Sequence, residues 1–206
     1  MKRRAFLGSA LAVPISRISA DDGGPVLRVV LNAESPAESH SYFLEFPEKK
    51  RPVGLGRNGV LQPGETFKGG YSLLGDFRVN AILSAEVFEM SDRLVAMSGY
   101  SREWLAEHLL ANMTSIDFDG DGKGGEYGDA FISLEPIENP EAQPFHFGEY
   151  KGVFRWYSYA IHGTQDESRI GKCVTGGCIN VAKTPLSEMV QALNLGDLVR
   201  VVSTGG

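Results

Sequence analysis

The chain has no run of eighteen apolar residues, only two cysteines, and fewer basic than acidic side chains, 20 against 26. Without a long apolar run, no segment is expected to cross a membrane as a helix. The net charge of −6 offers no basic surface for DNA or RNA, and it disfavours anionic lipid. We therefore expect no nucleic-acid partner and no membrane span.

What is present is the composition of an ordinary globular protein, with 42% hydrophobic and 10% aromatic residues. A chain of 206 residues is long enough to bury a sizeable core. We expect a targeting segment at residues 1–20, followed by one domain at residues 21–206. A change in character between about residues 85 and 128 indicates an insertion in that domain.

The first twenty residues resemble an export signal. Residues 1–4 are positively charged, Ala5–Ile15 is a short apolar stretch, and residues 18–20 form a cleavage site. The Arg3-Arg4 pair and the weak apolar core favour the twin-arginine route, which predicts a periplasmic protein. Cleavage would remove four basic side chains and no acid, so the net charge would move from −6 to −10. A disordered N-terminus with chance arginines is the alternative.

Alternating and apolar segments predict a mainly β domain, a sandwich or a barrel, with a few helices. The stretch Val53–Gly70 is rich in glycine and is expected to be a loop. Two helices, Ser91–Ser98 and Ser101–Met113, each begin at a serine and form the insertion. A third helix is expected to begin with Thr184 as N-cap and Pro185 as its first residue. The expected strands are Val26–Leu31, Tyr42–Phe46, Phe77–Ser84, Ala130–Leu134, Val153–Ile161 and Leu198–Val202.

The stretch from Ile161 to Val181 holds a histidine and, sixteen residues later, a cysteine, with glycines near both. The imidazole of His162 can accept a proton, and the thiolate of Cys178 can attack a carbonyl. Glycines around the sulfur leave backbone N–H groups uncovered for an oxyanion. The imidazole and these N–H groups also predict a lowered pKa for the Cys178 thiol. Taken singly, each residue could instead be inert, a hydrogen-bonded histidine or a cysteine that only packs.

The order H-G-T, I-G and T-G-G-C-I-N resembles the signature of the YkuD-type L,D-transpeptidases. That signature is a histidine, a gap, and then Ser/Thr-x-Gly-Cys-hydrophobic-Asn/Arg. A weaker similarity covers Pro52–Gly59 and Pro63–Phe67, and Gly176 stands where many members carry a second histidine. The resemblance spans roughly residues 26–84 and 129–202. The matching residues are His162, Thr175, Gly177, Cys178, Ile179 and Asn180.

The resemblance implies an L,D-transpeptidase-like β-sandwich with a helical insertion and a C-terminal helix plus strand. The implied reaction is acyl transfer on peptidoglycan stem peptides through a thioester, with release of D-alanine and transfer of the acyl group to an amine. Cys178 would be the nucleophile and His162 the base, while the Gly163 carbonyl would orient the imidazole. The backbone N–H groups of Gly177 and Cys178 would hold the oxyanion. No metal or organic cofactor is required for this chemistry.

The substrate pocket and two competing functions also follow from the resemblance. A hydrolase with the same cleft, an L,D-carboxypeptidase or a protein–peptidoglycan amidase, would use the same residues with water as the acceptor. A non-enzymatic wall-binding module would keep the fold with a blocked Cys178. The residues implied to shape the pocket are Tyr159, Thr175, Gly176, Gly177 and Asn180.

The two cysteines, Cys173 and Cys178, lie five residues apart. Two cysteines in an exported protein normally suggest a disulfide. A bridge between these two would consume the proposed nucleophile, so we expect two free thiols, with Cys173 as a packing residue.

An acidic stretch runs from Asp117 to Glu126. Asp117, Asp119 and Asp121 occupy the first, third and fifth places of an EF-hand-like loop. The twelfth place is Gly128 instead of the usual glutamate, and Glu126 comes two residues early. The pattern predicts a weak calcium site formed by Asp117, Asp119, Asp121 and Glu126; a solvated acidic turn is the alternative.

Export predicts a mature chain that begins at Asp21. The intact mass of protein extracted from the cell envelope should correspond to residues 21–206, because signal peptidase removes the preceding segment. Envelope protein that still carries Met1 would contradict this prediction.

Overall fold

The computed structural model describes residues 24–118, 120–138 and 146–204. The expected signal segment, residues 1–20, lies outside the described residues. Within them, no helix is both long and apolar enough to span a bilayer.

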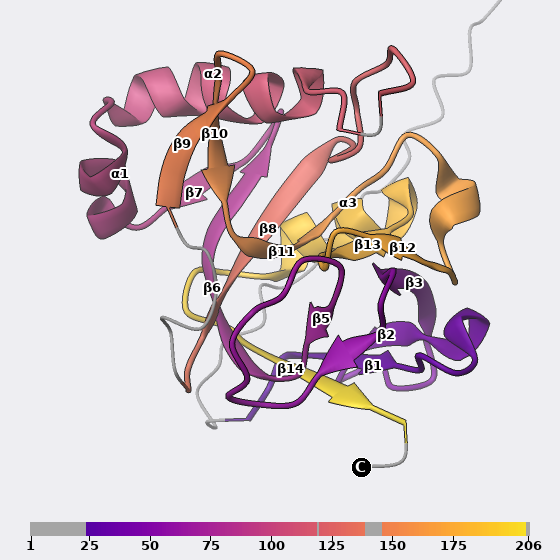
Figure 1. Ribbon diagram of the computed structural model, residues 1–206. Helices are drawn as coiled ribbons and strands as arrows, with labels where there is room; N and C mark the ends of the chain where they lie inside the picture. Colours follow the sequence, from indigo (N-terminus) through magenta and orange to yellow (C-terminus); the bar gives the residue numbers. More distant parts are fainter. Residues whose placement is uncertain (1–23, 119, 139–145, 205–206) are drawn as a thin grey trace, which may run out of the picture.

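Eight strands form a closed barrel that mixes parallel and antiparallel pairs (Figure 1). Their order is β3-β13-β11-β8-β6-β14-β1-β2, and pairing of β2 with β3 closes the ring. The parallel pairs within it are β1 with β14 and β11 with β13. The barrel strands are β1 (Leu27–Leu31), β2 (His40–Phe43), β3 (Arg51–Gly56), β6 (Gly75–Ser84), β8 (Ala130–Pro136), β11 (Tyr159–His162), β13 (Ile179–Val181) and β14 (Leu198–Ser203).

The remaining elements are attached to the barrel. Strand β12 (Cys173–Thr175) pairs with β3, and β7 (Phe88–Met90) pairs with β6. Two small sheets are formed by β4 (Val60–Leu61) with β5 (Ser72–Leu73), and by the hairpin of β9 (His146–Tyr150) and β10 (Val153–Tyr157). The helices are α1 (Asp92–Ser98), α2 (Arg102–Ser115) and α3 (Lys183–Ala192), with short 3-10 turns at Pro36–Glu38 and Glu167–Arg169.

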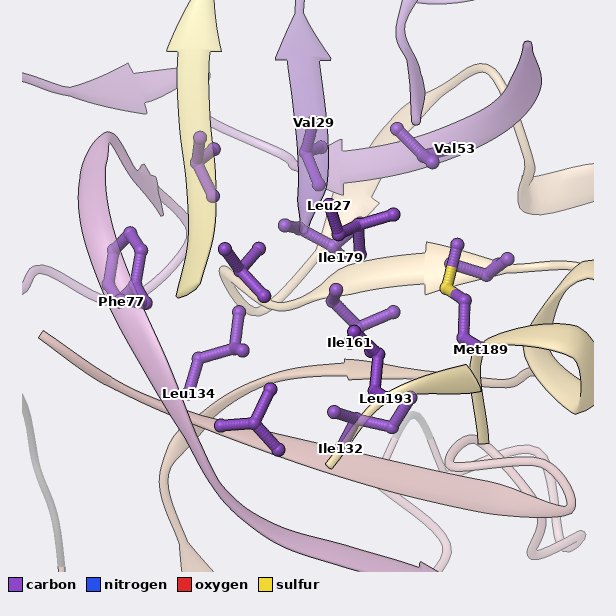
Figure 2. Packing of buried hydrophobic residues seen from close by; sticks show 14 of the residues in the cluster. Leu27, Val29, Val53, Phe77, Ile132, Leu134, Ile161, Ile179, Met189 and Leu193 are labelled. Carbon is purple, nitrogen blue, oxygen red and sulfur yellow. The ribbon is translucent and has the colours of Figure 1, made fainter. Parts of the chain in front are cut away.

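The barrel interior forms the main hydrophobic core. Side chains alternate between the two faces of a strand. In β1, Leu27, Val29 and Leu31 are therefore fully buried, while the residues between them are partly exposed. Met189 of helix α3 and Leu193, which caps the end of that helix, belong to the same core, where they lie beside barrel side chains such as Ile132 and Ile161 (Figure 2).

A second cluster, called here the outer cluster, lies on the outside of β6, β8 and β11. Helices α1 and α2 and the β9–β10 hairpin cover this face, at the end of the molecule away from β1, β2 and β14 (Figure 1). Strand β8 is therefore covered on both faces, which explains its nearly continuous apolar sequence. The buried members of the outer cluster are Ala81, Leu83, Met90, Leu94, Leu105, Leu109, Met113, Phe131, Trp156 and Ala160.

The prediction of a mainly β L,D-transpeptidase-type fold with a helical insertion and a C-terminal helix and strand is confirmed. Both insertion helices begin where the serines predicted, because the hydroxyls of Ser91 and Ser101 accept hydrogen bonds from the N–H groups of Leu94 and Trp104. The β-sandwich implied by the resemblance is corrected to a closed barrel, since the β2–β3 pairing closes the sheet.

Three local predictions are wrong. The stretch Val53–Gly70, expected to be a loop, contains most of β3 and all of β4. A glycine is needed in β3 because a Cβ on Gly56 would clash with the Gly70 backbone. The single strand predicted at Val153–Ile161 is interrupted at Ser158, so β10 belongs to the hairpin and β11 to the barrel.

The third error concerns the start of α3. Its N-cap is Ala182, which has no capping side chain, and not Thr184. The carboxylate of Glu167 takes over this role by accepting a hydrogen bond from the Lys183 N–H at 2.9 Å. A cap supplied from a distant segment leaves no signal in the local sequence.

Removing a side chain from the outer cluster should destabilise the whole domain. Leu109 is fully buried, so Leu109→Ala should lower the free energy of unfolding by about 2–5 kcal/mol, the usual cost of a leucine cavity. Leu195→Ala is the matched control, because Leu195 is 38% exposed, and it should change stability by about 0.5 kcal/mol or less. Chemical denaturation measures both; equal losses would contradict the assignment of the outer cluster as core.

Candidate active site

Pairing of two parallel strands brings the predicted histidine and cysteine to one face of the barrel. His162 ends β11 opposite Asn180 of β13, and Cys178 directly precedes β13. Ile161 and Ile179 point into the barrel core. The alternation of side chains then places His162, Asn180 and Cys178 on the outer face. Cys178 packs against the outer cluster there.

The Gly163 backbone carbonyl fixes the orientation of the imidazole. It lies 2.8 Å from Nδ1 of His162 and accepts a second hydrogen bond, of 3.0 Å, from Nδ2 of Asn180. Because a carbonyl can only accept, Nδ1 carries the proton and Nε2 is left as the basic nitrogen. The 3.3 Å approach of Asn180 Nδ2 to His162 Nδ1 then joins two donors and is not a hydrogen bond.

His162 is held in its neutral form. Its side chain is 7% exposed, and its ring packs against Tyr127 with the ring centroids 4.8 Å apart. Burial lowers the pKa of His162 to about 4, and the positive charge of Arg169 acts in the same direction, against the carbonyls of Gly163 and Glu126. A neutral imidazole at physiological pH can act as a base.

The Cys178 thiol is also neutral at rest, so the predicted lowering of its pKa is wrong. Burial raises the pKa of Cys178 to about 11, although the Ala160 N–H and the charge of Arg155 oppose this shift. The sulfur lies 3.7 Å from the Ser158 carbonyl, which accepts from the thiol. The sequence showed the polar neighbours of the sulfur but not the apolar outer cluster against which the half-buried Cys178 packs.

The turn before Cys178 is fixed by Thr175. Its hydroxyl donates to the Cys178 carbonyl at 2.6 Å and accepts from the Gly177 N–H at 3.1 Å. Of the two N–H groups expected to hold an oxyanion, that of Gly177 is therefore already used within the turn. Gly177 has a φ of +134°, and a Cβ there would lie 2.7 Å from the Tyr71 carbonyl, so the position requires glycine.

The other residues expected to shape the pocket lie in three different environments. A Cβ on Gly176 would meet nothing within 4 Å, so the place of the second histidine of many relatives is open space. Asn180 and Thr175 are buried and act on backbone groups of the site. Tyr159 faces the barrel core, where its hydroxyl donates to the Leu73 carbonyl at 3.0 Å. With 2% of its surface exposed, Tyr159 does not line the cleft, contrary to the expectation.

The residues that sequence reasoning missed come from the acidic loop and the hairpin. Tyr127 contacts His162, and Phe118 contacts Tyr127 with the ring centroids 5.4 Å apart. Trp156 of the hairpin belongs to the outer cluster that packs against Cys178. No motif marks these residues, because their role depends on tertiary contacts between segments that are separate in the sequence.

The acidic loop uses its described carboxylates on its own backbone. Asp117 accepts hydrogen bonds from the N–H groups of Gly120 and Gly122, at 2.6 and 3.0 Å. Glu126 accepts from the Phe118 N–H at 2.8 Å. Among the described residues, no three or more side chains that could bind a metal converge on one point. Asp119 lies outside the described residues. Calcium binding by Asp117, Asp119, Asp121 and Glu126 stays a prediction.

The two cysteines are free thiols in the structure, as expected. Cys173 lies on β12, where its sulfur is 4.0 Å from the Ala33 carbonyl. Burial raises the pKa of Cys173, so it has the character of a packing residue.

Comparison with known proteins gives the same family as the site. The sequence pattern of the YkuD family, described as the L,D-transpeptidase catalytic domain, matches residues 45–201. The chain therefore belongs to the L,D-transpeptidase catalytic domain family. It is 34% identical over 55 residues to a Fuscovulum blasticum protein named only as a candidate L,D-transpeptidase in the ATP synthase subunits region. That match spans 27% of this chain and 29% of the relative.

Two solved structures are also similar. An L,D-transpeptidase from Mycobacterium smegmatis is 12% identical, with 86% of this chain and 59% of that chain covered and a TM-score of 0.42. L,D-transpeptidase 3 from Mycobacterium tuberculosis, solved with a faropenem-derived adduct, is 14% identical, with 87% and 61% covered and a TM-score of 0.43. The chain spans less than two thirds of the length of each of these relatives.

The neutral resting state of His162 and Cys178 predicts how the alkylation rate of Cys178 depends on pH. Because the pKa of Cys178 is raised to about 11, alkylation by iodoacetamide should accelerate about tenfold per pH unit between pH 6 and pH 10. The alkylation rate of Cys178 is measured by peptide mass spectrometry in a Cys173→Ala protein, in which Cys178 is the remaining cysteine. A rate that is constant over this range would indicate a preformed thiolate–imidazolium pair and contradict the neutral assignment.

Proposed function

We propose that this domain catalyses acyl transfer on peptidoglycan stem peptides in the periplasm, with Cys178 as the nucleophile. The observation that carries the proposal is the hydrogen bond from Nδ1 of His162 to the Gly163 carbonyl. It leaves Nε2 as the base on the face of the barrel that also presents Cys178. Family membership supports the substrate class, because L,D-transpeptidases act on peptidoglycan.

The first half-reaction forms a thioester. Nε2 of His162 takes the proton of the Cys178 thiol as the sulfur attacks the carbonyl that joins an L-configured diamino-acid centre to the terminal D-alanine. The C–N bond breaks, and the imidazolium returns the proton to the departing amine of D-alanine. In the second half-reaction an amine attacks the thioester, His162 accepts the amine proton, and the sulfur leaves and is reprotonated.

The pKa shifts of the two groups favour a proton transfer that occurs only when substrate is bound. A thiol with a raised pKa and an imidazole with a lowered pKa do not exchange a proton at rest. Bringing a carbonyl to the sulfur lets the developing negative charge pass to the carbonyl oxygen, where backbone N–H groups can stabilise it. The Cys178 N–H is the one of the expected pair that Thr175 does not engage.

A hydrolase and a wall-binding module are the competing functions. A hydrolase would use the same thioester with water as acceptor, and a binding module would form no thioester. Neither a metal nor an organic cofactor is needed for the proposed reaction.

Product analysis with purified muropeptides tests the proposal. The protein should release D-alanine from a tetrapeptide donor and join the remaining acyl group to a second stem peptide. Cys178→Ala should abolish both products, and His162→Ala should slow D-alanine release about 10²- to 10⁴-fold, the range for a lost general base. Cys173→Ala is the matched control and should retain activity. Full activity in Cys178→Ala would refute the proposal, and D-alanine release without joined product would establish the hydrolase.

A further inference from the structure

Arg155 is a cation placed at the edge of the site with aromatic rings around it. It lies on β10, and its guanidinium carbon is 3.8 Å from the ring centroid of Tyr157, 4.8 Å from that of Phe118 and 5.6 Å from that of Tyr150. Phe118 comes from the acidic loop and the two tyrosines from the hairpin, so Arg155 lies between these two segments.

No acid within residues 24–118, 120–138 and 146–204 neutralises this guanidinium. Arg155 makes no hydrogen bond and no ion pair with any residue in the described part of the chain, and its Nε is buried without a partner there. The residue opposite it in the hairpin is Gly148, which has no side chain. A partly buried charge without a counter-ion is costly, and a bound anion would offset that cost.

A chain of ring contacts links this cation to the candidate catalytic histidine. Phe118, which contacts Arg155, also contacts Tyr127, and Tyr127 contacts His162. The charge of Arg155 acts on both Cys178 and Tyr127. Contacts with aromatic rings do not use the N–H groups of a guanidinium as hydrogen-bond donors to an acid, and those N–H groups match the two oxygens of a carboxylate.

We propose that Arg155 binds the free carboxylate at the C-terminal end of the donor peptide. The inference rests on the proposed function for the identity of the peptide. The bond to be cut lies one residue from that end, so the terminal carboxylate is only three covalent bonds from the carbonyl carbon that Cys178 attacks. An anion site at this edge of the active site therefore selects peptides that end one residue beyond the scissile bond.

Alkylation of the native protein tests the anion site without any transpeptidase assay. Iodoacetate carries a carboxylate and iodoacetamide does not, so the ratio of their rates at one sulfur reports a nearby anion-binding group. In the wild-type protein this ratio should be roughly tenfold higher at Cys178 than at Cys173, which serves as the internal control. Peptide mass spectrometry separates the two sites.

Variants assign the effect to Arg155. Arg155→Gln should reduce the Cys178 ratio to that of Cys173, and Arg155→Lys should retain part of the preference because it keeps the charge. Arg78→Gln removes an exposed arginine of β6 and should leave the ratio unchanged. Equal ratios at the two cysteines in the wild-type protein would overturn the proposal even if Arg155→Gln does not fold. Equal slowing of both reagents in Arg155→Gln would overturn it as well, since that result indicates an effect on the thiolate alone.

A pair of donors identifies which carboxylate is bound. The wild-type protein should form the acyl-enzyme at least tenfold faster from a tetrapeptide with a free C-terminus than from its C-terminal amide, and Arg155→Gln should lose this preference. A preference unchanged by Arg155→Gln would overturn the assignment to the terminal carboxylate. If neither donor acylates Cys178 while the alkylation ratio depends on Arg155, the proposed function fails and the anion site stands.

Discussion

The parallel pairing of β11 with β13 is the constraint on which the site depends. It sets His162 opposite Asn180 and places Cys178 on the same outer face, although the two candidate catalytic residues are separated by sixteen positions. The Gly163 carbonyl then receives hydrogen bonds from both the imidazole and the Asn180 amide. The Gly163 carbonyl oxygen therefore determines which nitrogen of His162 is basic. Asn180, which holds this oxygen, lies on β13, the strand that directly follows Cys178. A shift in the register of these strands would turn one residue of the pair into the barrel.

Burial on the outer face sets the electrostatics of that pair. The barrel alone would leave the outer faces of β8 and β11 in water, but the insertion helices and the hairpin cover them with the outer cluster. Removing water raises the pKa of Cys178 and lowers that of His162, because burial disfavours the charged form of each group. The insertion is thus part of the site, and a cation such as Arg155 has more influence there than it would in water.

The signature residues and the class of fold could be predicted from the sequence, because each depends on local information. Serine N-caps, strand alternation and the spacing of His162, Thr175, Gly177 and Cys178 are all visible in the chain. The errors arose where distant segments decide the outcome. Position 56 is a glycine within a strand because the Gly70 backbone approaches it too closely for a Cβ, and Lys183 begins a helix that Glu167 caps. Tyr159 looked like a pocket residue, yet strand alternation turns it into the core. The raised pKa of Cys178 could not be predicted because the residues that pack against it come from the insertion helices, the barrel strands and the hairpin, which are distant from it in the sequence.

Covalent catalysis at Cys178 is the central claim, and trapping the acyl-enzyme tests it most directly. The protein is mixed with a tetrapeptide donor in the absence of an acceptor amine, quenched in acid and digested for peptide mapping. The account predicts an adduct with the mass of the donor acyl group on Cys178, released by hydroxylamine as a thioester should be. An adduct on Cys173, or turnover of the donor with Cys178 never acylated, would contradict it.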